Sequence, residues 1–178
     1  MSQPIAPSNN EILLNNGDLI VSKTCLKGNI TYANRHFMSI AGFTEQQLLQ
    51  QPHSIIRHPD MPRGVYRMMW QSLRSGREFF GFVKNLCSDG SFYWVFANVT
   101  PDLDEKGEVR GYYSVRRKPS REAIEAVIPL YKKMCEIEMA GRGSSAIDES
   151  MKFLTDWVDS TGLSYSQVAL HLYRHGSL

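Results

Sequence analysis

Short apolar runs alternate with turn residues in the first two thirds of the chain, a pattern typical of strands. One run starts at Leu19 and a second covers residues 30–32, and the turn Lys27-Gly28-Asn29 separates them. Further along, three longer apolar segments are joined by polar, glycine-containing turns, which predicts consecutive antiparallel hairpins. These segments are 79–87, 91–101 and 109–118.

Between the two groups of strands the apolar spacing becomes helical, and capping residues mark the helix starts. Asn34 stands where a helix N-cap is expected, and this helix stops at Gly42. Thr44 and Gln47 form a capping box for a second short helix. A longer helix is predicted for residues 62–75, because apolar side chains recur there every four residues.

The last third of the chain is predicted to be helical. An apolar stripe runs through residues 124–134, and Pro129 within it is expected to kink or restart the helix. Residues 140–145 are predicted to form a flexible joint, and a second stripe covers 147–158. A final helix opens with another capping box at Ser164.

This order of elements predicts an α+β fold. One five-stranded antiparallel sheet carries the short helices on one face, and the helices and the sheet enclose a ligand cavity. Residues 1–17 are expected to be a flexible N-terminal lead, 18–118 the α+β domain and 119–178 a C-terminal helical extension. Both faces of the strand around Val95 are apolar, so alternation alone does not indicate which face lines the cavity.

Composition narrows the class of protein. The 178 residues carry a formal net charge of +2, which does not indicate a nucleic-acid partner. The three cysteines are scattered without paired spacing, which predicts a reducing compartment and neither disulfides nor a zinc site. No apolar run approaches the roughly 20 residues of a membrane span, and the polar start does not match a signal peptide. We therefore expect a cytoplasmic protein without a membrane segment.

Few residue patterns indicate chemistry. No Ser–His–Asp pattern, phosphate-binding loop or paired-carboxylate site stands out, so an enzyme is not expected. The densest polar cluster is Arg57, His58 and Asp60, framed by prolines. Its arginine and histidine suit phosphate or carbonyl recognition, and the alternative is a solvated loop in which Asp60 caps the next helix. Asn85 lies within a predicted strand, where a buried amide needs a partner.

Several motifs resemble those of PAS domains over residues 18–118. They are Ile30-Thr-Tyr-Ala-Asn34, Phe37, Gly42-Phe-Thr44, Asp89-Gly90 with Trp94, and Gly111-Tyr112. A narrower resemblance links the segment Gln51-Pro-His-Ser-Ile-Ile-Arg-His-Pro-Asp-Met-Pro62 and Val83-Lys-Asn85 to the flavin-binding PAS domain of bacterial aerotaxis receptors. Those receptors bind FAD non-covalently, and its redox state reports on cellular energy status.

The resemblance implies a cofactor site. FAD would contact Arg57, His58, Asp60, Trp70, Asn85, Ser114 and Arg116. Asn85 would face the flavin, and the smaller side chains of the fourth strand would line the cavity. These side chains are Tyr93, Val95, Ala97 and Val99. Light-sensing PAS relatives place a cysteine on the short helix before the long one, and residues 53–61 contain none, so no cysteinyl–flavin adduct is expected.

The expected function is signal transduction, in which the chain reports redox, energy or oxygen status through residues 116–121 into the C-terminal helices. The alternatives are a PAS sensor of haem, with His53 or His58 as axial ligand, a sensor of a small metabolite, or a ligand-free interaction module. The last two helices are too short to be stable alone in water, so they need the sheet, a second copy or another signalling protein as partner. A homodimer is favoured. Aerotaxis receptors continue into membrane-anchoring and signalling regions that these 178 residues lack, which leaves a stand-alone protein and the input part of a longer one both open.

Overall fold

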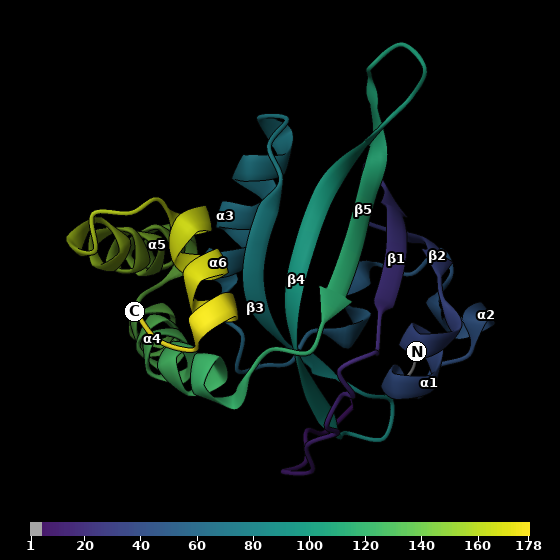
Figure 1. Cartoon of the computed structure of the whole chain (residues 1–178), viewed down its shortest axis with the longest axis horizontal. Helices are drawn as coiled ribbons and strands as arrows, with labels where there is room; N and C mark the ends of the chain where they lie inside the picture. The colour runs from purple at the N-terminus through teal and green to yellow at the C-terminus, as the bar shows by residue number, and fades with distance from the viewer. Residues whose placement is uncertain (1–4) are drawn as a thin grey trace.

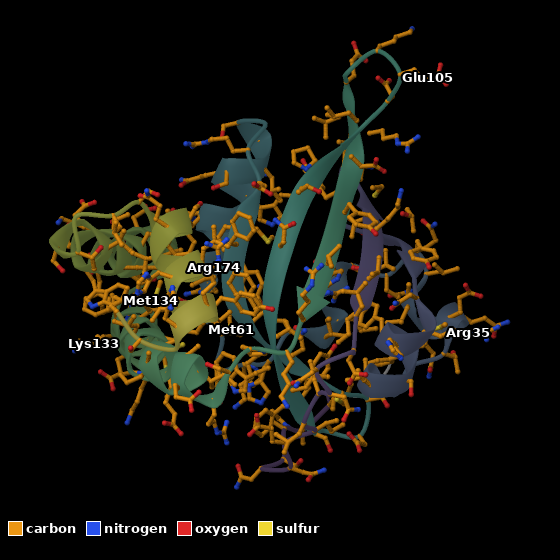
Figure 2. All side chains as sticks on the ribbon, in the orientation of Figure 1. Arg35, Met61, Glu105, Lys133, Met134 and Arg174 are labelled. Atoms are coloured by element: carbon orange, nitrogen blue, oxygen red, sulfur yellow. The ribbon has the colours of Figure 1, made fainter. Side chains whose placement is uncertain are left out.

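The computed structural model describes residues 5–178 and has an antiparallel sheet at its centre (Figure 1). The strands are β1 Ile20–Cys25, β2 Ile30–Ala33, β3 Phe79–Leu86, β4 Phe92–Leu103 and β5 Val109–Arg117. Their order across the sheet is β2-β1-β5-β4-β3, and every neighbouring pair is antiparallel. The predicted α+β fold with one five-stranded sheet is thus confirmed. The β4–β5 hairpin extends beyond the other strands, with Glu105 at its tip (Figure 2).

The helices fall into two groups around this sheet. They are α1 Arg35–Ala41, α2 Glu45–Leu48, the 3-10 helix η1 His53–Ile56, α3 Arg63–Arg74, α4 Arg121–Ala140, α5 Gly143–Ser160 and α6 Tyr165–His175. Figure 1 shows α1 and α2 beside β1 and β2, whereas α4, α5 and α6 gather near β3 at the opposite edge. None of the helices within residues 5–178 is long and apolar enough to span a bilayer.

The helix starts follow the local capping signals. The Asn34 side chain accepts a hydrogen bond from the Phe37 amide at 3.0 Å, and Gly42 ends α1 with φ 70° in the left-handed region. The Asn34 carbonyl oxygen Oδ1 also accepts from the Val21 amide at 3.0 Å, which ties α1 to β1. The capping boxes at Thr44 and Ser164 are both formed.

Alternate residues of β4 divide the core into two parts. Tyr93, Val95 and Ala97 point toward α1, α2 and η1, and they belong to an inner cluster with Phe37 and Leu48. Side chains on the opposite, outer face of the sheet belong to a second cluster with α4, α5 and α6. The larger of these are Phe82, Trp94 and Phe96. The smaller side chains therefore face the inner helices, as the resemblance implied.

The C-terminal extension packs on the sheet of its own chain. Tyr173 of α6 stacks on Phe96 with ring centroids 4.1 Å apart, and Tyr165 stacks on Phe79 at 5.5 Å. The Tyr131 hydroxyl of α4 donates to the Phe82 carbonyl at 2.8 Å. Helix α5 packs on α3 and α4 and buries Leu154 and Val158 there. The apolar stripes that were expected to require a partner are thus covered within the chain, so they no longer argue for a homodimer.

The structure narrows two expectations for the extension. Helix α4 runs through Pro129 without a restart. Pro129 and Glu125 are both exposed, so the carbonyl that the proline leaves without a partner can bind water. The predicted joint at 140–145 is confined to Gly141 and Arg142, since α5 already begins at Gly143.

The described part of the N-terminal lead lies along the start of β4. The Ile12 amide donates to the Phe92 carbonyl at 2.7 Å, and the Phe92 amide donates to the Asn10 carbonyl at 2.9 Å. Leu14 is buried in the inner cluster, whereas Leu13 is exposed. Residues 1–4 lie outside the described residues. The sequence predicted no such pairing, because it joins segments 80 residues apart.

Candidate functional site

A cavity of about 100 Å³ lies between the inner face of the sheet and the helices η1 and α3. Its lining residues are His53, Ser54, Ile56, Arg57, Tyr66, Met69, Trp70, Val83, Asn85, Ala97, Val99, Ser114 and Arg116. Five of the seven residues that the resemblance implied are in this set: Arg57, Trp70, Asn85, Ser114 and Arg116. The backbones of Arg57 and Asn85 pair in an isolated antiparallel bridge, which joins the loop before α3 to β3.

Arg116 is a buried cation at the centre of the sheet. Arg116 is only 2% exposed, and its side chain forms no ion pair with a carboxylate within residues 5–178. Its guanidinium lies 4.5 Å from the centroid of the Phe37 ring, and Nη2 donates to the Ser22 hydroxyl at 2.5 Å. Burial lowers the pKa of Arg116 to about 10, so the group remains charged at neutral pH.

His53 completes this polar chain as a neutral side chain. Its Nε2 lies 3.1 Å from the Ser22 hydroxyl and 3.5 Å from Nη1 of Arg116. Burial of the ring, together with the charge of Arg116, lowers the pKa of His53 to about 3. Because Arg116 only donates, Ser22 accepts from the guanidinium and donates to Nε2 of His53. This arrangement occupies the ring nitrogen that an axial haem ligand would use.

Arg57 is the second cation of the cavity. Its guanidinium lies 3.8 Å from the centroid of the Tyr66 ring, a cation–π contact with α3. Burial raises the pKa of Tyr66 to about 12, so its hydroxyl stays protonated at physiological pH. Arg57 therefore lies between η1 and α3. It lines the cavity and also contacts α3, the helix that forms one cavity wall.

Several hydrogen-bonding atoms around the cavity have no partner among the described residues. Three belong to lining residues: Nε of Arg57, Nδ2 of Asn85 and Nε of Arg116. The fourth is the hydroxyl of Tyr93, which faces the inner helices but does not line the cavity. Leaving a buried polar group unpaired costs about 1–3 kcal/mol. Since no acidic side chain is among the lining residues of this described cavity, its unpaired N–H donors favour a ligand that accepts hydrogen bonds and tolerates positive charge.

Trp70 closes the cavity on the side of β5. Its ring meets the Tyr112 ring edge-on with centroids 5.2 Å apart, and its ring edge lies against Gly28. The cavity volume is smaller than the roughly 300–1,000 Å³ of sites for drug-sized ligands, so a planar ring system needs movement of α3 or η1 to enter.

His58 and Asp60 do not line this cavity. His58 is 3% exposed, its Nδ1 accepts from the Asp60 amide at 3.1 Å, and its ring packs edge-on against Phe92. Asp60 pairs with Lys84 at 2.6 Å and lines a separate groove on the outer face of the sheet. The chain crosses the edge of β3 between Arg57 and Met61, so only the first residue of the polar cluster reaches the inner side.

Sequence reasoning missed Ser22, Tyr66 and Met69 as parts of the site. A signal for Tyr66 was present, since it precedes Trp70 by four residues and such pairs share one face of a helix. Ser22 gave no signal, because its contact with Arg116 depends on the pairing of β1 with β5.

Comparison with known proteins agrees with this geometry. A family model described as the PAS fold matches residues 30–116. The chain is 40% identical to the aerotaxis receptor of Escherichia coli (strain K12) over 139 residues, which are 78% of this chain and 26% of the receptor. It is 32% identical to a nitrogen fixation regulatory protein of Klebsiella pneumoniae over 105 residues, which are 59% of this chain and 21% of that protein. The chain thus spans about a quarter or less of these relatives.

Solved structures share the fold. A light-oxygen-voltage domain studied with a flavin analogue has a TM-score of 0.55 at 20% identity, and the match covers 65% of this chain and 86% of that one. The light-state structure of the LOV domain of the blue-light photoreceptor Aureochrome1 has a TM-score of 0.54 at 22% identity, covering 64% and 90%. Taken with the family match and the sheet-enclosed cavity, these findings show that the chain contains a PAS domain.

Proposed function

We propose that this PAS domain is a redox or energy sensor that holds FAD in the inner cavity and signals through its C-terminal helices. The observation that carries the proposal is the cavity's polarity. Two guanidinium groups, Arg57 and Arg116, and the amide of Asn85 each have a nitrogen without a partner there. The identity to an aerotaxis receptor supports signalling, rather than catalysis, as the activity of the whole protein.

The lining residues fit a flavin ring. The ring presents carbonyl oxygens and ring nitrogens that accept hydrogen bonds, and charged donors contribute about 1.5–3 kcal/mol to each such bond. The flat apolar walls are provided by Val83, Ala97 and Val99 on the sheet and by Met69 and Trp70 on α3. Arg116 favours any negative charge on the ligand, because its own charge has no carboxylate partner in the described cavity.

Asn85 is suited to report a change in the ligand. A bound flavin supplies redox chemistry in which one ring nitrogen changes from hydrogen-bond acceptor to donor. The Asn85 amide carries both a donor and an acceptor, so rotation of the side chain satisfies either form. Exchanging one such bond is worth on the order of 1 kcal/mol, which shifts a balanced two-state element severalfold.

The absorbance spectrum of the purified protein tests this proposal. We expect the visible bands of an oxidised flavin, bleached reversibly by dithionite, and we expect heat to release FAD rather than FMN. Blue light should leave the oxidised bands unchanged, because none of the residues lining the described cavity is a cysteine.

Three outcomes would contradict the proposal. They are a colourless protein that added FAD does not reconstitute, a Soret band in place of flavin bands, and release of FMN alone. Free FAD in the same buffer, passed through the same desalting column, is the control for carry-over of unbound flavin.

A further inference from the structure

Helix α3 begins without a cap of its own. Pro62 occupies the N-cap position and makes no side-chain hydrogen bond to the first turn. The amides of a first helical turn need acceptors from elsewhere, and a carboxylate is favoured there because it also meets the positive end of the helix dipole.

Glu138, which lies 75 residues further along the chain in α4, provides this cap. Its Oε1 accepts from the Gly64 amide at 2.8 Å, and its Oε2 accepts from the Arg63 amide at 2.9 Å. The Ser150 hydroxyl of α5 donates to Oε1 at 2.7 Å. One carboxylate therefore joins the start of α3 to both α4 and α5.

The protonation state of Glu138 suits this role. Burial alone would raise the pKa of this carboxyl, but the hydrogen bonds from Ser150, Gly64 and Arg63 together hold its pKa below the ordinary value. The group is thus ionised at neutral pH and accepts from every donor that surrounds it.

Close packing between α3 and α5 reinforces the link. A Cβ at Gly64 would clash with the Ser150 hydroxyl and would come within 3.0 Å of the methyl group of Met134. Met134 is fully buried on α4, the helix next to α5 in Figure 2. Arg67, one turn further along α3, pairs with Asp148 of α5.

The opposite side of α3 forms the cavity wall. Tyr66, Met69 and Trp70 line the cavity, whereas no residue of α4, α5 or α6 does so in the described structure. A planar ligand needs more room than about 100 Å³, so its entry displaces the wall. Any displacement of α3 acts directly on the helices that Glu138 attaches to it.

We propose that Glu138 is a positioning residue that couples the cavity wall to the C-terminal helices through its cap on α3. Occupation of the cavity moves α3, and the Glu138–Ser150 pair passes this movement to α4 and α5. The identity of the ligand as FAD rests on the proposed function, whereas the link between α3 and α5 does not. This relay carries the signal from the cavity to the C-terminal helices through α3. It is a second route beside the one from β5 through residues 116–121.

Amide hydrogen exchange of the ligand-free protein tests the link without any flavin. In Glu138→Gln, the amide group of the new side chain brings N–H donors toward the first-turn amides of α3. We expect exchange to rise severalfold in both 63–70 of α3 and 146–154 of α5. Glu136→Gln is the matched control, because Glu136 lies on the same helix, is exposed and, among residues 5–178, forms an ion pair only with Lys133. If α3 exchanges in Glu138→Gln as it does in the wild type, the proposal is overturned.

A second arm uses FAD and a milder variant. Ser150→Ala leaves the cap on α3 intact and removes only the bond from Glu138 to α5. FAD should change the exchange of 146–154 in the wild type and in Glu136→Gln, and this response should fall at least twofold in Ser150→Ala and in Glu138→Gln at equal flavin occupancy. A full α5 response in both variants would refute the relay. Failure of the wild type to bind FAD would instead refute the proposed ligand, and the ligand-free arm would then decide the role of Glu138.

Discussion

A chain that ends at Arg142 is expected to be largely unfolded or aggregated, because α5 covers apolar surface of α3 and α4, and α6 packs on β3. The extension buries Leu154, Val158, Val168 and Leu172. At about 1.5–3 kcal/mol for each large apolar side chain, these four contribute on the order of 10 kcal/mol. That is comparable with the roughly 5–15 kcal/mol by which a whole domain is stable. The truncation also uncovers Phe96, on which Tyr173 stacks.

Thermal unfolding and light scattering measure this effect. The full chain should be monomeric, since its own sheet and helices already cover the apolar stripes of the extension. A chain ending at Gly176 is the control, because it lacks only the exposed residues Ser177 and Leu178. A version ending at Arg142 that is monomeric and as stable as the full chain would show that the extension does not dock on the sheet in solution.

Replacing Arg116 by methionine is expected to change stability and flavin binding in opposite directions. The buried guanidinium has no carboxylate partner in the described cavity, so an apolar side chain of similar length should raise the stability of the ligand-free protein by about 1–3 kcal/mol. The same change removes a charged donor from the proposed ring site. The dissociation constant for FAD should therefore rise about 10- to 100-fold.

Denaturant unfolding and FAD titration of the same samples test both halves of this prediction. Arg117→Met is the matched control, since Arg117 is the next residue of β5 but is exposed on the outer face, opposite Phe96. Arg117→Met should leave the FAD affinity unchanged. An Arg116→Met protein that binds FAD as tightly as the wild type would mean that the ring lies away from Arg116.

Local signals in the sequence were sufficient to predict most of the fold. The strands and capping boxes depend on residues within a few positions of each other, as Asn34 and the Thr44–Gln47 pair show. The choice of cavity face was different, because β4 is apolar on both sides. Only the PAS resemblance predicted that Tyr93, Val95, Ala97 and Val99 would line the cavity. Ala97 and Val99 do so, whereas Tyr93 and Val95 face the inner helices without lining it.

The candidate site was predicted less completely, for a physical reason. Arg57, His58 and Asp60 are neighbours in sequence, but the chain crosses the edge of β3 between them and places their side chains on different sides of the sheet. Spacing within a loop does not indicate such a crossing. The cap from Glu138 to Gly64 was equally hidden, because it joins helices 74 residues apart and depends on how they pack.

The position of the flavin ring is the central claim, and the indole N–H signals of the tryptophans test it most directly. The chain has three tryptophans in three environments: Trp70 in the inner cavity, Trp94 beside the outer groove and Trp157 on α5. In a ¹H–¹⁵N spectrum, assigned with Trp→Phe variants, stoichiometric FAD should shift the Trp70 signal most, because an aromatic ring close by changes its magnetic environment. A shift of Trp94 with Trp70 unchanged would place the flavin on the outer face and contradict the account.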